Sequence, residues 1–215
     1  MTALNHDSIV DAGMDLVRDE GWPRLSVRSV AARLDVTPMA LYRHVSSSDA
    51  LSLGVITKIA EGFIDVRGSG DAFADLDWWA RRAHAALVPF PGAAGHLLAT
   101  WFEVPPALRA VERLLEVAYA AGLRDFEAVA AVNAVFTYVL MRAEAEQTVR
   151  NAGAVKRSLK LAAAEGELPR LSALAEHYTT ARFDLHFDYG LRVLLDGIAV
   201  PAAATRGEPV RGERT

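Results

Sequence analysis

The side chains best suited to recognising a large partner are basic, aromatic and small polar groups within residues 28–48. The guanidinium of Arg28 can donate two parallel hydrogen bonds to O6 and N7 of a guanine. Pro38 and Met39 can pack on a thymine methyl group, and the donors of Tyr42 and His44 suit phosphate oxygens. We therefore expect this segment to contact a DNA major groove through Arg28, Thr37, Pro38, Met39, Tyr42, Arg43, His44 and Ser48.

Two short helices joined by a tight turn would hold these groups in place. Ser26 is a suitable N-cap for the first helix, since its hydroxyl can accept a hydrogen bond from an unpaired amide of the first turn. Thr37 can cap the second helix, and Pro38 suits its first turn because no N–H is needed there. Asp35, between them, tolerates the positive φ of a sharp turn. The apolar positions that would pack the two helices together are Val27, Val30, Ala31, Leu34, Leu41 and Val45.

This arrangement is typical of a helix-turn-helix whose second helix, here Pro38–His44, enters the major groove, although the pattern alone also fits an ordinary helical hairpin. The flanking sequence favours the first interpretation, because residues from about Asn5 to Ile64 resemble the TetR family of bacterial repressors. The resemblance is strongest in residues 25–45 (LSVRSVAARLDVTPMALYRHV) and 48–51. A weaker likeness to the tetracycline-repressor branch covers residues 187–198.

The resemblance implies a homodimer on a palindromic operator, with half-sites roughly one helical turn apart. It also implies that Arg28 contacts a base, with a phosphate contact or a surface salt bridge as the alternatives. Two positions depart from the family pattern: Asp35 stands where Gly is usual, and Ser48 where many members have a Lys that contacts phosphate. Pro38 replaces an amide that reads adenine in a relative, so we expect a different operator from that of the tetracycline repressor.

The distribution of charge favours DNA binding more than the net charge of −4 does. Between Gly21 and Ser48, Asp35 is the only acidic residue and it is outnumbered by Arg24, Arg28, Arg33 and Arg43. The chain of 215 residues has no cysteine, which excludes disulfides and thiolate metal sites. We see neither a signal peptide nor a stretch approaching the roughly 20 apolar residues that span a bilayer. These features predict a soluble, cytoplasmic protein without a membrane partner.

Helical periodicity interrupted by Gly and Pro covers most of the chain, and no long alternation predicts a strand, so we expect an all-α fold. The expected helices are 6–20, 27–34, 38–44, 48–66, 72–88, 93–101, 107–121, 123–151, 156–165 and 181–198. A break at Gly68–Gly70 divides the chain into two domains: a helix-turn-helix head with its connecting helix (1–67), and a larger helical ligand-binding and dimerisation domain (71–200). Residues 201–215 lack large apolar side chains and are expected to be disordered.

The larger domain concentrates aromatic and histidine side chains in a way that suits a cavity for a small apolar molecule. A plain hydrophobic core is the alternative for each residue, but a buried Trp needs a partner for its N–H, and this favours a cavity. The expected ligand-binding residues are Trp79, His84, His96, Trp101, Phe136, Tyr138 and Met141. His96 matches, in local pattern, a metal-ligating position of the tetracycline repressor, but Ala143 lies near where a second ligand would be needed. We therefore expect no metal and no cofactor.

The final helix has an apolar surface too wide for a helix with one buried face. The family resemblance implies that it pairs with helix 123–151 in a dimeric four-helix bundle; the alternative is the central helix of a monomer. Glu144 and Glu146, two residues apart, point to different sides of a helix and are expected to be solvated.

Known catalytic motifs do not occur in the sequence, so we do not expect an enzyme. The function that we expect is ligand-responsive DNA-binding transcriptional regulation, by a repressor that a small hydrophobic molecule releases from its operator. The alternative is an all-helical protein that binds such a molecule without contacting DNA.

Overall fold

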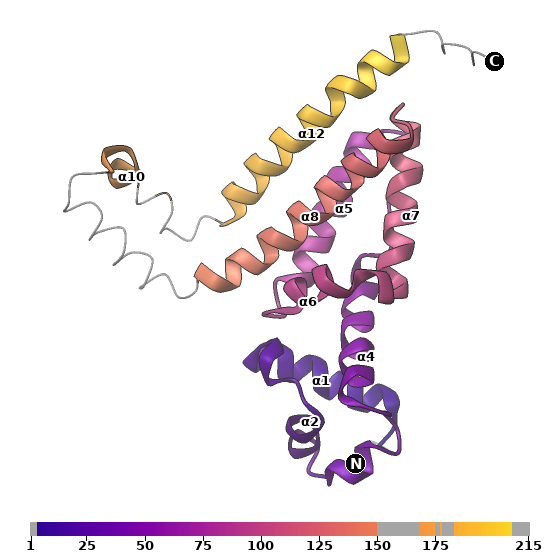
Figure 1. Ribbon diagram of the computed structural model, residues 1–215, viewed down its shortest axis with the longest axis vertical. Coiled ribbons are helices and arrows are strands. Elements are labelled where there is room, and N and C mark those ends of the chain that lie inside the picture. Colours follow the sequence, from indigo (N-terminus) through magenta and orange to yellow (C-terminus); the bar gives the residue numbers. More distant parts are fainter. Residues whose placement is uncertain (1–3, 150–167, 175–176, 178–182, 208–215) are drawn as a thin grey trace.

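The computed structural model describes residues 4–149, 168–174, 177 and 183–207, and within these ranges it contains helices and no strands. A small head formed by the first helices lies at one end of a larger helical body (Figure 1). The elements are α1 (His6–Glu20), η1 (Trp22–Arg24), α2 (Val27–Arg33), α3 (Pro38–Leu41), α4 (Ser48–Ala60), η2 (Glu61–Phe63), α5 (Ala72–Leu87), α6 (Ala93–Thr100), η3 (Trp101–Glu103), α7 (Pro105–Ala120), α8 (Asp125–Val149), α10 (Pro169–Ala173) and α12 (Phe183–Gly207). The expected all-α fold is confirmed.

Local capping explains the helix boundaries of the head. At the start of α1, the amide of Ser8 donates to Asn5 Oδ1 over 2.8 Å, and the Asn5 amide donates back to Ser8 Oγ over 3.0 Å. This reciprocal pair satisfies two amides that the helix itself leaves unpaired. Gly21 ends the helix at φ 85°, a conformation open to glycine because it has no Cβ. The bounds of α1 are those that the sequence predicted.

The turn between α2 and α3 also follows the expected chemistry. Ser26 Oγ accepts a hydrogen bond from the Ser29 amide at 3.1 Å, and Thr37 Oγ1 accepts one from the Ala40 amide at 3.3 Å. Asp35 has a φ of 53°, as the sharp turn requires.

The predicted extent of the second helix to His44 is wrong, because α3 ends at Leu41. The amide of His44 bonds to the Leu41 carbonyl at 2.8 Å, three residues back, and this tighter turn replaces the next turn of α helix. The turn brings Val45 into the core, where 3% of its surface is exposed. Met39, Tyr42, Arg43 and His44 therefore lie partly on α3 and partly on the turn that follows it.

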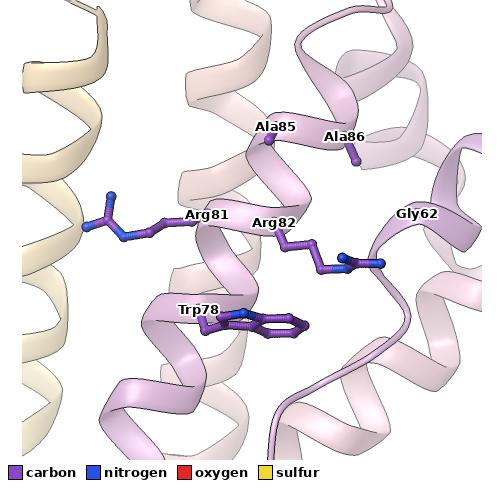
Figure 2. A pocket seen from close by; sticks show the side chains of 6 residues that line it. All are labelled: Gly62, Trp78, Arg81, Arg82, Ala85 and Ala86. Carbon is purple, nitrogen blue, oxygen red and sulfur yellow. The ribbon is translucent and has the colours of Figure 1, made fainter.

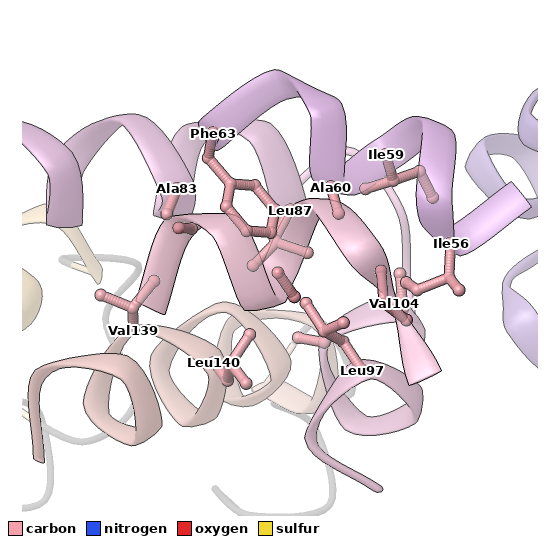
Figure 3. Close-up of a cluster of buried hydrophobic side chains, with 14 of the residues drawn as sticks. Ile56, Ile59, Ala60, Phe63, Ala83, Leu87, Leu97, Val104, Val139 and Leu140 are labelled. Atoms are coloured by element: carbon pink, nitrogen blue, oxygen red, sulfur yellow. The ribbon is translucent and has the colours of Figure 1, made fainter. Parts of the chain in front are cut away.

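The core is continuous between the head and the body. Ile56, Ile59 and Ala60 of α4, together with Phe63, reach buried side chains of α5, α6 and α8, among them Ala83, Leu87, Leu97, Val139 and Leu140 (Figure 3). Helix α4 ends at Ala60 and not at the predicted Val66. The Phe63 carbonyl accepts a hydrogen bond from Trp79 Nε1 at 2.9 Å, so this part of the chain bonds to α5 and does not continue as α helix.

Helix α8 is central to the body, because α5, α6, α7 and α12 all pack against it. By length and mean hydropathy, its segment Asp125–Glu146 is also apolar enough to cross a membrane, so the expectation that the chain has no such stretch is wrong. A single such helix is weak evidence, since core helices of soluble proteins pass the same test. Its buried side chains include Ala128, Val132, Val135, Phe136, Val139, Leu140 and Ala143. Since these pack inside the body, we assign α8 to the core.

Helix α12 lies alongside α8 and extends further than predicted (Figure 1). The segment after Val200 was expected to be disordered, but it is helical as far as Gly207. Ala202 is completely buried there, and alanine is the strongest helix former, which together favour a continued helix despite Pro201. Residues 208–215 and the predicted helix 156–165 lie outside the described residues. Helix α10, at Pro169–Ala173, lies between the predicted helices 156–165 and 181–198 and was not predicted.

Candidate DNA interface and effector cavity

The residues expected to contact DNA are all exposed in the structure: Arg28, Thr37, Pro38, Met39, Tyr42, Arg43, His44 and Ser48. Met39 is 72% exposed and Tyr42 is 47% exposed, values at which large apolar groups are available to a partner. Leu41 and Val45, which the pattern placed toward the first helix, are buried. The head therefore presents the second helix and the turn after it to the outside.

Acidic side chains of α1 neutralise much of the positive charge that the sequence places near the reading surface. Arg33 forms an ion pair with Asp19, and Arg24 Nε lies 3.3 Å from Glu20 Oε2. In the part of the chain that the structure describes, Arg28 and Arg43 have no ion-pair partner. Of the four arginines between Gly21 and Ser48, these two therefore have the guanidinium groups most available to DNA.

A partly enclosed, apolar cavity of about 270 Å³ lies between α7, α8 and η3. Two of the expected ligand-binding residues, Trp101 and Phe136, line this cavity, with ring centroids 5.8 Å apart. The Phe102 ring lies 3.7 Å from the Trp101 ring. The lining residues are Trp101, Phe102, Val111, Leu115, Val129, Val132, Asn133 and Phe136.

The cavity residues that sequence reasoning missed follow helical spacing. Val111 and Leu115 are four residues apart on α7, and Val129, Val132 and Asn133 lie on the same stripe of α8 as Phe136. This i, i+3, i+4, i+7 pattern was present in the sequence. It does not, however, distinguish a stripe that lines a cavity from one that packs in a core.

The other predicted ligand-binding residues lie outside this cavity. Trp79 is buried behind it, with its ring stacked at 5.9 Å on Phe136 and its N–H bonded to Phe63. Met141 is half exposed on α8. The Tyr138 hydroxyl donates to the carbonyls of His186 and Phe187, at 3.1 and 3.0 Å, and so joins α8 to α12.

His84 belongs to a largely buried polar cluster between α5, α8 and α12. Its Nε2 lies 2.9 Å from Glu146 Oε1, and its ring stacks at 4.0 Å on Phe187. Burial lowers the pKa of His84 below its usual 6.5, and the carboxylate of Glu146 opposes this shift in part.

The expectation that Glu144 and Glu146 are both solvated is wrong. The side chain of Glu146 is 13% exposed, and Glu144 Oε2 accepts a hydrogen bond from the Gly95 amide at 3.1 Å. These carboxylates point to different sides of α8, as predicted, but each side faces another helix: α6 for Glu144 and α5 for Glu146. Helix packing and not the local sequence therefore decides their environment.

His96 lies at the contact between the body and the head. Its ring stacks on Trp22 with centroids 4.3 Å apart and an angle of 25° between the planes. The Trp22 amide donates to the Pro91 carbonyl at 2.7 Å, and a Cβ on Gly92 would come within 2.7 Å of Trp22 Cβ. The guanidinium of Arg18 lies 4.9 Å from the Phe90 ring centre. The start of α6 and the loop before it thus form a close contact with the α1–η1 corner.

Two further hollows are more open than the cavity between α7, α8 and η3. One, of about 560 Å³, lies between η2 and α5, where Trp78 and Arg82 point toward Gly62 while Arg81 points away toward α12 (Figure 2). Arg81 is paired there with Asp77 and Asp188. The second, of about 510 Å³, runs between α8 and α12 and is lined by Asn133, Ala134, Thr137, Tyr138, Gly190, Val193 and Leu194.

Exposed apolar side chains of α12 lie at the groove between α8 and α12. Val193, which lines the groove, is 54% exposed, and Tyr189, four residues before it on the same helix face, is 70% exposed. Large apolar groups gathered on one face mark an interaction surface. This confirms that α12 has more apolar surface than one protomer buries.

An exposed helix-turn-helix, joined to a helical body with an apolar cavity, defines a ligand-responsive DNA-binding transcriptional regulator. Comparisons with known proteins agree with this class. The family model "Tetracyclin repressor-like, C-terminal domain" matches residues 67–201, and the model "Bacterial regulatory proteins, tetR family" matches residues 9–53. The chain therefore belongs to the TetR family.

Individual relatives match along most of their length. The HTH-type transcriptional repressor DrrR1 of Streptomyces coeruleorubidus is 30% identical over 220 residues, which cover 95% of this chain and 81% of that protein. The tetracycline repressor protein class A from transposon 1721 of Escherichia coli is 29% identical over 208 residues, with coverages of 93% and 92%. The crystal structure of a possible TetR family transcriptional regulator from Streptomyces coelicolor A3(2) has a TM-score of 0.81 at 29% identity, covering 90% of this chain and 98% of that one.

Proposed function

We propose that this protein is a cytoplasmic transcriptional repressor that binds a palindromic operator as a homodimer and leaves it when a small apolar effector enters the cavity. The observation that carries the proposal is the position of the segment α6–η3. At one end His96 and Gly92 contact Trp22 of the head, and at the other end Trp101 and Phe102 form a wall of the cavity. A molecule in the cavity thus has a direct structural connection to the reading head.

In this proposal residues 1–67 form the reading head with its connecting helix, and residues 71–200 form the effector-binding and dimerisation domain. Arg28 reads a base, while Tyr42, Arg43, His44 and Ser48 contact phosphate. Thr37, Pro38 and Met39 lie against the groove floor, where apolar atoms can meet thymine methyl groups. The activity is binding alone, without catalysis.

The dimer is built from α8 and α12. Their groove and the exposed apolar groups beside it supply a surface that a second copy would cover in an isologous contact. Dimerisation fixes the distance between the two heads, and operator binding depends on that distance. An effector acts by binding more tightly to a conformer in which the heads no longer match the half-sites.

The test is a mobility-shift titration with DNA from the promoter region of the protein's own gene, at several salt concentrations between 50 and 200 mM. We expect specific binding that weakens as salt rises, because phosphate contacts release counterions. A random DNA of equal length is the control for non-specific binding. Equal affinity for the two DNAs at every salt concentration would contradict the proposal.

A further inference from the structure

We propose that the cavity between α7, α8 and η3 selects an uncharged, planar aromatic molecule of about two fused rings, with a hydrogen-bonding group directed at Asn133. This inference rests on the proposed function, since it names the chemical class of the effector for the same cavity.

The planar shape follows from the aromatic walls. Trp101 and Phe136 have ring centroids 5.8 Å apart, and Phe102 lies 3.7 Å from Trp101 at an angle of 29° between the planes. Phe102 is 70% exposed beside the cavity, so one face of a large ring is left available to a guest. Aromatic guests gain from offset stacking on such faces beyond the area that they bury, and aliphatic guests of equal size do not.

The preference for an uncharged ligand follows from the residues that line the cavity. Apart from the aromatic rings and Asn133, the described lining residues are Val111, Leu115, Val129 and Val132, and none of the described lining residues is titratable. A carboxylate or ammonium group that entered the enclosed part of this cavity would lose its water and find no ionic partner among them, which is strongly unfavourable. A neutral guest avoids this cost.

The hydrogen-bonding group follows from Asn133. Its amide carries both donors and an acceptor, and among the described lining residues it is the one polar group besides the indole N–H of Trp101. A hydroxyl or carbonyl group on the guest can pair with it. Asn133 also lines the groove between α8 and α12, so the polar end of the guest would lie near the proposed dimer contact.

The size follows from the volume. Cavities for drug-sized ligands span roughly 300–1,000 Å³. The cavity here, at about 270 Å³, lies just below that range and suits a molecule of two fused rings better than one of four.

The experiment compares four matched probes on the full chain without DNA: 2-naphthol, naphthalene, 2-naphthoate and decahydro-2-naphthol. Affinities are measured at pH 7 by calorimetry or by ligand fluorescence. We expect 2-naphthol to bind at least tenfold more tightly than 2-naphthoate, which differs by its charge, and than decahydro-2-naphthol, which is not planar. Naphthalene, which lacks the hydroxyl, should bind about fivefold more weakly than 2-naphthol. Equal or tighter binding of the charged or the saturated probe, or no binding by any probe, would overturn the inference.

Two variants assign the binding to this cavity. Asn133→Leu should remove the preference for 2-naphthol over naphthalene while leaving naphthalene binding within threefold. Trp101→Ala should weaken both aromatic probes at least tenfold, whereas Trp78→Ala, in the open groove of Figure 2, should leave them unchanged. Thermal melting and sedimentation show whether each variant is folded and keeps its assembly. Unchanged probe binding in folded Trp101→Ala would place the site elsewhere.

A separate operator titration distinguishes this inference from the proposed function. If 2-naphthol binds with the expected selectivity but the protein stays on the operator, the inference on the effector's chemical class holds, and the proposed release from the operator fails for this probe. If a charged or saturated molecule releases the operator and binds more tightly than 2-naphthol, the repressor function stands and the inference on effector class is wrong.

Discussion

The indole of Trp22 stacks on the imidazole of His96, and this pair joins the corner between α1 and η1 to helix α6 of the body. Trp22 is bound a second time through its amide, which donates to the Pro91 carbonyl. Burial lowers the pKa of His96 below its usual 6.5, so the ring is neutral at pH 7 and stacks without a charge to desolvate.

Replacing His96 should separate effector binding from operator release. We expect His96→Ala to bind the operator within about tenfold of the wild type, or roughly 1.4 kcal/mol, because the reading surface is intact. An effector that releases the wild-type protein should still bind this variant but release it at least tenfold less efficiently. The measurement pairs operator titrations with and without effector with direct effector titration. Release by the same effector concentration as in the wild type would show that the stack does not transmit the signal.

Removing Arg28 should affect sequence preference, whereas removing Arg43 should affect affinity for all sequences. We expect Arg28→Ala to cost about 1–3 kcal/mol on the operator and to relax the preference at one base pair per half-site. Arg43→Ala should lower affinity uniformly and reduce the salt dependence. Arg33→Ala is the matched control with little effect on either, because Arg33 is already paired with Asp19. Equal losses on operator and random DNA for Arg28→Ala would make it a phosphate contact.

A charge in the groove between α8 and α12 should prevent dimerisation. Val193 is 54% exposed in one protomer, so Val193→Glu leaves the fold of that protomer intact but places a carboxylate in the proposed interface. Burying it unpaired costs several kcal/mol, so we expect monomers and loss of operator binding. Ala99→Glu, on the exposed side of α6, is the control that should remain dimeric. A dimer of Val193→Glu in analytical ultracentrifugation would place the interface elsewhere.

Gly190 should be essential for the junction of α12 with α8. A Cβ at this position would overlap the Tyr138 hydroxyl and come within 2.9 Å of its Cζ, so Gly190→Ala should lower the free energy of unfolding by about 1–3 kcal/mol. Gly197→Ala in the same helix is the control, because its Cβ would meet nothing within 4 Å in its own protomer. There we expect a gain of about 0.5–1 kcal/mol from helix propensity. Thermal or chemical denaturation measures both, and Tyr138→Phe should recover part of the Gly190→Ala loss.

His84 should make stability depend on pH. Because burial lowers its pKa in the folded state, the unfolded chain binds more protons than the folded one just below pH 6.5. This contribution to stability is therefore full above pH 6.5 and is lost as the pH falls through the lowered folded value. Chemical denaturation between pH 7.5 and 5 should show a smaller loss for His84→Gln than for the wild type, by at most about 1.4 kcal/mol per pH unit. Parallel pH profiles for the two proteins would contradict the assignment.

Local chemistry was predictable from the sequence, and contacts between distant segments were not. The Ser26 cap, the Thr37 cap and the positive φ of Asp35 depend on neighbouring residues, so the starts of both helices and the turn between them could be predicted, whereas the end of α3 at Leu41 could not. The excess of positive charge predicted for residues 21–48 did not take account of Asp19, which lies on a different helix and pairs with Arg33. Trp101 and Phe136 were found from their residue type, but a cavity and a core have the same apolar composition.

The surroundings of His84 and His96 could not be predicted for the same reason, because they too are formed by distant segments of the chain. Both histidines were predicted to bind the ligand, but neither lines the cavity: His96 stacks on Trp22, and His84 contacts Phe187 and Glu146. These partners come from the head and from the last helices. Their meeting depends on how helices pack, which is set by the shapes of many side chains at once.

The head is attached to the body at two separate places: through the unbroken chain of α4 and η2, and through Trp22 against Pro91 and Gly92. A rigid unit fixed at two points keeps a single degree of freedom, which is rotation about the line that joins them. Displacement of α6 should therefore turn the head about this hinge line, and in a dimer two such rotations, related by symmetry, would change the separation of the two recognition helices together.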